Sequence, residues 1–232
     1  MINFIIKLFL ILIFVIFLLC ILKIDLKIGA WKFEFSTFLK KGLPKIDDRF
    51  GCWFVCGRQG SGKNFQAIRL ILLQSPNLCN KIYTNVHSLK IPGFKIEYFD
   101  KITDIYFNTD EHCIFLIDEV ARKYNKNART DDQFYAWLNQ SRKRKRIVIL
   151  ITQEWKELPM WLRRPAKYMF TTYQNGLCKL LNLYITSMGD AENMIYDKDE
   201  GEYTCPVIKK YLYKRNKYIA DMYDTFEAIN QL

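Results

Sequence analysis

The sequence predicts a three-layer α/β domain with a mainly parallel central sheet, preceded by one transmembrane helix. Short apolar runs alternate with segments of helical periodicity through residues 50–165. The run IVILIT at 147–152 is apolar up to its final threonine, as expected for a strand that is covered on both faces. The first 22 residues are apolar except for Asn3 and Lys7, and about 20 such residues cross a bilayer.

The apolar segment at the start of the sequence is predicted to be a membrane anchor. Residues 8–22 form an unbroken apolar run. A cleaved signal peptide would have small residues before its cleavage site, and a buried core helix would have a polar face; the segment has neither. Positive residues stay on the cytoplasmic side, so the lysines after the run place the rest of the chain in the cytosol: Lys23, Lys27, Lys32, Lys40, Lys41 and Lys45.

The length and net charge of the chain limit the number of domains and the kind of partner. The chain has 232 residues and a formal net charge of +11, which fits one sizeable domain with an acidic partner. Nucleic acid, anionic lipid and nucleotide are all negatively charged partners that such a chain could bind. The seven cysteines are an odd, irregularly spaced set without a CxxC pair, so we expect buried thiols in a reducing compartment and no metal site built from them.

Hydrophobic periodicity predicts the elements in order. Residues 24–49 are predicted to be a juxtamembrane linker. The expected strands are 50–56, 81–86, 113–118, 147–152, 166–173 and 179–187, and the expected helices are 63–75 and 131–146, the second capped near Thr130. We interpret 196–203 as an acidic hairpin or loop, and 217–229 as a short helix or an irregular docking segment.

The stretch GRQGSGKN between the first strand and the first helix matches the phosphate-binding pattern G-x-x-x-x-G-K. Backbone N–H groups in such a loop point at the phosphates of a nucleotide, and the lysine reaches the β- and γ-phosphate oxygens. The pattern continues with Ser or Thr as a ligand of Mg²⁺, and here the residue is asparagine. We therefore predict a nucleotide site with altered metal binding, formed by Gly57, Arg58, Gln59, Gly60, Ser61, Gly62, Lys63 and Asn64.

Two later strand ends supply the groups that phosphoryl transfer needs. CIFLIDEV ends in Asp118 and Glu119 after an apolar run. We expect Asp118 and Asn64 to bind Mg²⁺, and Glu119 to orient or deprotonate the attacking water. The next apolar strand ends in Thr152 and Gln153. Because the carboxyl ends of parallel strands line one crevice, the Gln153 amide is expected to contact the γ-phosphate.

These motifs, in this order, resemble the zonular occludens toxin family, which includes the assembly ATPases of filamentous phages and is related to DNA-pumping and packaging ATPases. The resemblance covers about residues 50–228 and rests on the phosphate loop, on YTNVHSL with Asn85, on LIDEV, and on SRKRKRIVILITQ. LRRPAKYMF and DMYDTFEAI are similar to later family segments. Unlike in that family, the apolar span precedes the domain. The resemblance implies a P-loop ATPase domain, which we expect at residues 50–232, and the apolar segment separately predicts the anchor at 1–23.

The basic run at 142–146 has three interpretations. It is a solvated helix end, a contact for the phosphate backbone of DNA, or the source of an arginine finger for a neighbouring subunit's ATP. The resemblance favours the third role for Arg142, and also marks Arg129 as a family arginine. Tyr135 and Trp137 could stack on bases, although packing in a helix core is the simpler interpretation.

The function expected from these features is ATP binding and hydrolysis that drives virion assembly, DNA export or packaging at the bacterial inner membrane. ATP and Mg²⁺ are the expected cofactors. The expected partners are further copies of the chain, phage DNA, the membrane, and coat or assembly proteins. A nucleotide-gated membrane scaffold with little turnover is the alternative, and a basic membrane-surface protein without a nucleotide would leave three ordered motifs as coincidence.

Overall fold

The computed structural model describes residues 2–22, 24–35, 38, 50–73, 79–199 and 201–223. Its elements are α1 (Ile2–Leu22), β1 (Leu26–Ile28), β2 (Trp31–Phe33), β3 (Gly51–Cys56), α2 (Lys63–Leu73), β4 (Lys81–Thr84), β5 (Lys95–Tyr98), η2 (Ile102–Ile105), β6 (Cys113–Ile117), η3 (Val120–Arg122), α3 (Asp132–Asn139), β7 (Ile147–Thr152), η4 (Trp155–Glu157), α4 (Met160–Arg163), β8 (Ala166–Tyr173), α5 (Gly176–Leu180), β9 (Leu183–Asp190), β10 (Ile195–Asp197), β11 (Glu202–Thr204), β12 (Val207–Lys214) and α6 (Lys217–Ala220).

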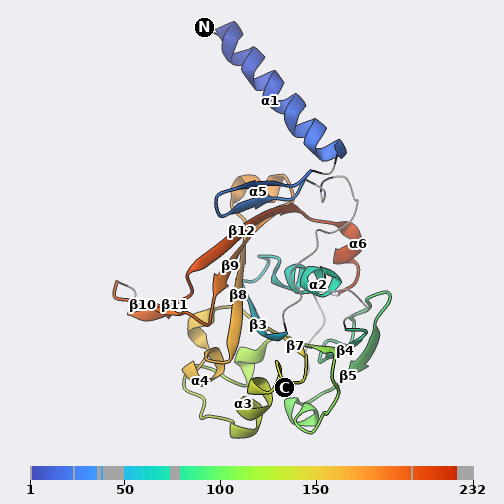
Figure 1. Cartoon of the computed structure of the whole chain (residues 1–232), viewed down its shortest axis with the longest axis vertical. Helices are drawn as coiled ribbons and strands as arrows, with labels where there is room; N and C mark the ends of the chain where they lie inside the picture. The colour runs from blue at the N-terminus through green and yellow to red at the C-terminus, as the bar shows by residue number, and fades with distance from the viewer. Residues whose placement is uncertain are drawn as a thin grey trace.

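A ten-stranded sheet organises the domain, in the order β1-β2-β12-β9-β8-β3-β7-β6-β4-β5 (Figure 1). The six strands from β8 to β5 are mutually parallel. The sheet continues beyond β8 through antiparallel β9 and β12. This confirms the predicted α/β class with a mainly parallel sheet. Strand β7 lies between β3 and β6, so the ends of these three strands are neighbours.

The central strands are buried on both faces because two separate apolar clusters cover them. Every residue of β3, β6 and β7 is buried. On one face, Trp53 and Val55 pack with the apolar side of α2. On the other, Phe54 packs in the cluster that includes Phe134 of α3 and Leu162 of α4. Alternate residues of one strand thus serve two cores, which explains the continuous apolar runs in the sequence.

The segment predicted to be a linker is structured in part. β2 pairs in parallel with β12, and β1 pairs with β2 in a hairpin that turns at Gly29, so both strands belong to the main sheet. Glu34, directly after β2, is 1 % exposed and forms a buried ion pair with Arg69 of α2. The linker prediction is therefore wrong for 26–33, because strand pairing with a distant partner leaves little signal in a three-residue run.

Several other boundaries shift. β5 and β12 were not predicted, since neither shows a continuous apolar run. The strand expected at 179–187 begins later, after the short helix α5. α3 ends at Asn139, well before the predicted 146, and is capped by the Asp131 carboxylate accepting from Phe134 N–H. The acidic stretch at 196–203 forms most of the β10–β11 hairpin. Predicted helical residues 74, 75 and 224–229 lie outside the described residues.

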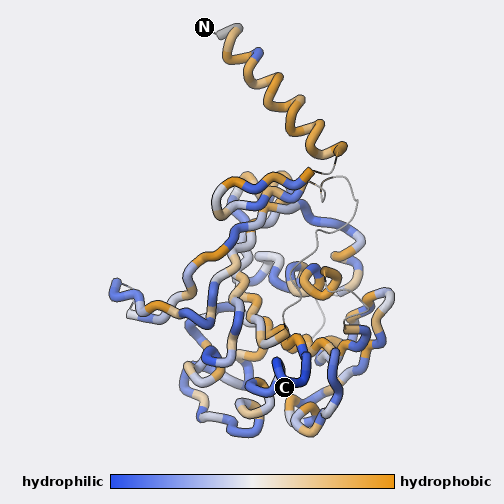
Figure 2. Tube along the Cα trace, viewed as in Figure 1, coloured by the Kyte–Doolittle hydropathy of each residue, from blue (hydrophilic) through white to orange (hydrophobic). Residues whose placement is uncertain are grey.

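Helix α1 projects away from the domain and is apolar along nearly its whole length (Figure 2). Among the described residues it is the one helix long and apolar enough to cross a membrane, over Phe4–Leu22. Its side chains from Phe4 to Leu18 are exposed. The seven cysteines are all free and buried, as the interpretation as small hydrophobic residues requires.

Candidate nucleotide-binding site

The predicted phosphate loop joins β3 to α2, and it has glycine where no side chain fits. A Cβ at Gly57 would lie 2.2 Å from the Ser61 hydroxyl oxygen and 2.7 Å from the Thr172 carbonyl oxygen. Gly62 has a φ of 87°, and a Cβ there would lie 2.3 Å from the Tyr184 ring. Larger residues at either position would distort the loop, so the glycines maintain its path.

The loop ends at the amino terminus of α2, which is an anion-binding arrangement. The hydrogen bond from Gln66 N–H to the Gly62 carbonyl (2.9 Å) closes the first turn of the helix. The backbone N–H groups before Gln66 therefore point out of the helix end. Gly57 N–H donates to the Gln153 carbonyl (3.0 Å), which ties the loop to the end of β7. With the ammonium of Lys63, the first residue of α2, these amides form a cradle suited to phosphate.

Asp118 lies directly after β6 and is held in place by the residue that follows β4. Asp118 N–H donates to the Asn85 side-chain oxygen (2.9 Å), and the Asn85 amide donates back to the Asp118 carbonyl (3.1 Å). The Asp118 side chain accepts from Glu119 N–H (2.7 Å) and from the Tyr223 hydroxyl (2.7 Å). The carboxylate is 2 % exposed, so its position is set on every side by the protein.

Electrostatics link this carboxylate to the loop. Burial raises the pKa of Asp118, and the Tyr223 hydroxyl, the charge of Lys63 and the Glu119 N–H oppose that rise. A buried carboxylate whose main cost is lost hydration is stabilised by a nearby cation. The Tyr223 hydroxyl bonded to Asp118 belongs to a residue that lines the same cavity as Lys63, which connects the two predicted motifs.

The residues present fit a magnesium ion. The side-chain oxygen of Asn64 is buried and has no hydrogen-bond partner. An orphaned buried carbonyl oxygen is costly unless something binds it, and amide and carboxylate oxygens are ligands that Mg²⁺ accepts. Asn64 and Asp118 would therefore hold the ion, with the asparagine in place of the usual hydroxyl.

Glu119 has an unusual backbone and a partner that the sequence analysis did not identify. Its φ and ψ of 54° and 39° lie in the left-handed region, which costs a non-glycine residue about 1–3 kcal/mol and is concentrated at functional sites. Its carboxylate forms an ion pair with Arg122, three residues later. That spacing was the available signal for Arg122. Tyr223 left no comparable signal, because 105 residues separate it from Asp118.

Two cavities meet at the loop, and Gln59 and Gly60 border both. The smaller, of about 470 Å³, is lined by Lys63, Asn64 and Tyr223, together with Tyr184 and Arg215. Since Lys63 is suited to phosphate and Asn64 to a metal, this is the candidate nucleotide cavity. Tyr184 and Arg215 were not predicted, since nothing in their local sequence marks them.

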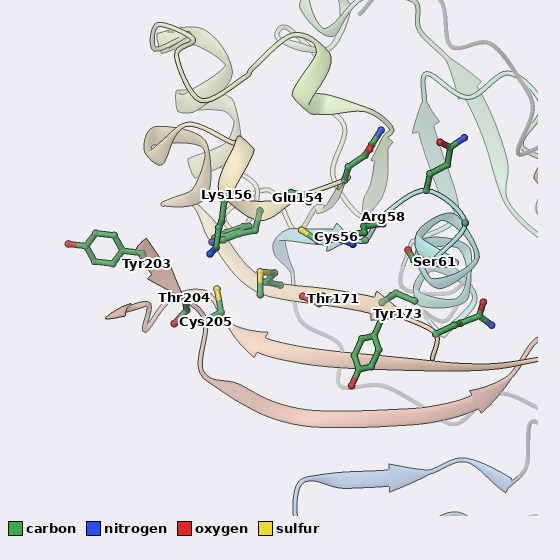
Figure 3. A pocket seen from close by; sticks show the side chains of 18 of the residues that line it. Cys56, Arg58, Ser61, Glu154, Lys156, Thr171, Tyr173, Tyr203, Thr204 and Cys205 are labelled. Atoms are coloured by element: carbon green, nitrogen blue, oxygen red, sulfur yellow. The ribbon is translucent and has the colours of Figure 1, made fainter. Parts of the chain in front are cut away.

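The larger cavity, of about 750 Å³, extends from the other side of the loop. Figure 3 shows its walls, with Arg58 and Ser61 of the loop facing Tyr203 and Cys205 across it. Gln153 also lines this cavity and has an exposed side chain. The backbone of Gln153 is thus bonded to the loop, while its predicted contact with the γ-phosphate remains a prediction.

The structure separates the basic residues into different roles. Arg142 is exposed, forms an ion pair with Glu192, and lies beside Gly51 at the amino end of β3. The phosphate loop is at the opposite end of that strand, so a finger role for Arg142 requires the site of another subunit. Arg146 is fully buried and donates to the carbonyls of Asp110 and Asn108, both at 2.6 Å. Of the three interpretations of the basic run, none holds for Arg146, because its guanidinium is buried and bonded to backbone carbonyls.

The two aromatic residues suggested for base stacking and the second family arginine also have clear positions. Trp137 is buried and packs edge-on against Phe115, so helix-core packing is confirmed for it. Tyr135 contacts Trp161. Arg129 is exposed in the segment between η3 and α3 and is not one of the residues that line the candidate nucleotide cavity.

A phosphate loop between a parallel strand and a helix, with a buried carboxylate at the end of a strand two positions away, defines the P-loop NTPase class. The fold is similar to that of the N-terminal domain of zonular occludens toxin from Neisseria meningitidis, with 17 % identity, a TM-score of 0.54, and coverage of 76 % of this chain and 100 % of that one. The predicted resemblance is thereby confirmed at the level of the fold.

A looser likeness links the chain to the genome packaging NTPase B204 from Sulfolobus turreted icosahedral virus 2. In its complex with sulfate, that protein shares 12 % identity, with coverage of 73 % of this chain and 98 % of that one. The TM-score of 0.47 is too low to support an inference. No protein-family model matches the chain, and no curated protein matches it in sequence.

Replacing Asn64 by serine is expected to raise Mg²⁺ affinity and turnover by roughly tenfold, equivalent to about 1.4 kcal/mol for a better-placed ligand. The serine hydroxyl is shorter and would let the ion sit closer to the loop. Mg²⁺ titration of ATP turnover measures the change. Asn139→Ser, at the exposed end of α3, is the matched control. An Asn64→Ser variant that is no faster than the native chain would contradict the assigned ligand role.

Replacing Tyr223 by phenylalanine is expected to lower the Mg²⁺ concentration for half-maximal ATP binding by about tenfold. The change removes the hydroxyl that occupies one oxygen of Asp118, and hydrogen bonds to charged groups contribute about 1.5–3 kcal/mol. Tyr218→Phe, on the same terminal segment but 59 % exposed, controls for loss of a hydroxyl. A higher Mg²⁺ requirement in Tyr223→Phe would show instead that the hydroxyl supports the metal-bound carboxylate.

Proposed function

We propose that this chain is a membrane-anchored ATPase that binds ATP with Mg²⁺ and hydrolyses it to drive phage or virion assembly, DNA export or packaging. The observation that carries the proposal is a cavity lined by Lys63 and by Asn64, whose side-chain oxygen is buried without a hydrogen-bond partner. Tyr223 lines the same cavity and donates to the Asp118 carboxylate behind it. Backbone N–H groups of a glycine-rich loop, a lysine and two side-chain oxygen ligands are the groups that bind a nucleotide with its magnesium ion.

Each of these side chains has a separate task in the proposed reaction. The loop amides and Lys63 bind the β- and γ-phosphates and balance charge that grows on the transferred phosphoryl group. Mg²⁺ held by Asn64 and Asp118 would supply positive charge that offsets the negative charge of the phosphates. Glu119 orients the attacking water and accepts its proton. Because Arg122 pairs with Glu119 in this structure, that pair must loosen for the carboxylate to reach water.

The proposed location and partners follow from charge and hydropathy. Helix α1 would anchor the chain in the bacterial inner membrane, with the domain on the cytoplasmic side where ATP is present. The net charge of +11 favours phage DNA as a partner. The position of Arg142 at the far end of β3 supports action in trans, which requires a homo-oligomer. Coat or assembly proteins are the remaining proposed partners.

A nucleotide-gated scaffold with little turnover is the second candidate, and specific contacts favour it. Tyr223 occupies an oxygen of Asp118, and Arg122 pairs with Glu119. Both acidic groups thus have protein partners in this conformation. If the contacts persist with the nucleotide bound, ATP would close the site without rapid hydrolysis, and the bound state would be the signal to partners.

Mg-ATP turnover by the full chain in lipid nanodiscs, with and without single-stranded DNA, tests the proposal. The full chain is needed because removing β2 and Glu34 would leave Arg69 buried without its charge partner. DNA-stimulated turnover that is lost in Lys63→Ala supports the motor. ATP binding that depends on Lys63, without turnover in an oligomer, supports the scaffold. Nucleotide binding unchanged in Lys63→Ala would refute both.

A further inference from the structure

The short helix α5 presents its apolar side outward. Leu177, Leu180 and Leu181 are 67 %, 79 % and 51 % exposed, and together they form what we term the leucine patch. Their spacing of three and four residues puts them on one side of the helix. Cys178, on the other side, is buried in a small cluster with Leu183 and Ile185. A surface helix normally turns its apolar side to the core, so the leucine patch requires another explanation.

The leucine patch lies at the end of the domain from which α1 departs. Trp31 of β2 packs against the cluster that contains Cys178, so the β1–β2 hairpin and α5 are neighbours (Figure 1). Residues 23–25 alone separate α1 from β1. Leu26 and Ile28 of β1 are also exposed. An exposed apolar edge strand invites aggregation unless something covers it.

Positive side chains surround this apolar surface and form what we term the basic rim. Lys214 pairs across the sheet with Leu183, and Arg215 N–H donates to the Asn182 carbonyl (2.8 Å), which places both beside the end of α5. The members of the rim, all exposed, are Lys27, Lys179, Lys214 and Arg215. In described residues 24–33, 174–182 and 212–218, the one carboxylate is Asp25, which pairs with Lys32.

We infer that the leucine patch and the basic rim form a second membrane contact, in which α5 lies in the interface of an anionic bilayer. Leucines at such a depth bury apolar surface among acyl chains, and lysine and arginine contact the anionic headgroups. The inference rests on the proposed membrane anchoring by α1. Two contacts would hold the domain in one orientation on the bilayer, since they attach it at two separate points.

This arrangement would also orient the nucleotide site relative to the bilayer. β9 follows α5 directly and carries Tyr184, which packs on Gly62 of the phosphate loop. Arg215, a member of the basic rim, also lines the nucleotide cavity. A lipid contact at α5 would therefore be connected to the proposed phosphate loop through a single strand, β9.

Depth-dependent fluorescence on the full chain in nanodiscs tests the inference. The probe is an environment-sensitive fluorophore on Leu180→Cys, with quencher lipids and anionic phospholipid; the seven native cysteines are buried and an unsubstituted chain measures their background. Phe107→Cys is the matched control. Phe107 is 84 % exposed and lies in the connection from β5 to β6, and β5 is the strand at the opposite edge of the sheet from β1. We expect a blue shift and loss of emission at 180, and neither at 107.

Further variants separate the inference from its rivals. In the Leu180→Cys background, Leu177→Ser with Leu181→Ser should reduce the quenching, as should omission of anionic lipid. Equal exposure of the probes at 180 and 107 to water would overturn the inference. A probe at 180 that becomes more protected in detergent as the protein concentration rises would also overturn it, because that result reports contact with a second copy of the chain. Carbonate extraction and ATP binding are measured in parallel. A chain that stays in the bilayer and binds ATP, with position 180 in water, refutes this inference alone.

Discussion

Replacing Glu119 by glutamine is expected to reduce Mg-ATP turnover by about 10²–10⁴-fold, the contribution typical of a positioned general base. The amide retains the shape of the side chain but cannot accept the proton of the attacking water. ATP affinity should change little, because the proposed site holds the phosphates with the loop amides and Lys63. Steady-state turnover and equilibrium nucleotide binding, measured on the same full-length preparation, separate the two effects.

Two variants control this experiment. Glu111→Gln makes the same chemical change at an exposed residue before the opposite end of β6, and its turnover should match that of the native chain. Lys63→Ala should lose ATP binding as well as turnover. If Glu119→Gln turns over at the native rate, another group activates the water, and Glu154, exposed beside the larger cavity, becomes the next candidate.

Replacing Glu34 by alanine is expected to lower the free energy of unfolding by about 3–5 kcal/mol, the usual cost of removing one partner of a buried ion pair. Glu34 and Arg69 are each 1 % exposed, and the Arg69 guanidinium also lies 4.3 Å from the centre of the Tyr213 ring. Without the carboxylate, Arg69 would be a buried, uncompensated charge in the helix that begins at the phosphate loop. Urea unfolding of the full chain in detergent measures the change.

The matched comparison for Glu34→Ala is an exposed ion pair. Lys95 is 74 % exposed and lies 3.2 Å from Glu97, so Lys95→Ala should change stability by less than about 1 kcal/mol. Replacing both Glu34 and Arg69 by methionine should recover much of the lost stability, since no charge remains buried. Equal, small effects of Glu34→Ala and Lys95→Ala would show that the buried pair does not tie the hairpin to α2.

The parallel core could be predicted, apart from the edge strand β5, because each of its other strands carries its own signal. β7 and β8 were predicted to the residue, since their runs are apolar or alternate clearly and pack against helices on both faces. The three-residue strands β1 and β2 carry no such signal. They form because β12 offers them a pairing edge, and a run of three residues cannot show that it has a distant partner.

The residues of the candidate site likewise include some that the sequence marks and others whose position only the structure shows. The loop, Asp118 and Glu119 are contiguous motifs whose chemistry depends on adjacent residues, so the sequence identifies them. Arg146 belongs to a local basic run, yet it is buried, with its guanidinium 5.5 Å and 5.6 Å from the centres of the Phe115 and Trp137 rings. Composition alone does not distinguish a guanidinium bound to backbone carbonyls from one exposed to DNA, because both are arginine next to lysine.

By itself the sequence determined helix α2 and the strands of the parallel core other than β5, and it marked the phosphate-loop pattern and the acidic pair after β6, because these signals lie in adjacent residues. The tertiary structure decided which distant groups meet them: Tyr223 on Asp118, Glu34 on Arg69, and β7 between the loop strand and the acidic strand. It also decided that three leucines of α5 face outward. Such contacts depend on how the whole sheet packs, and local periodicity carries no record of them.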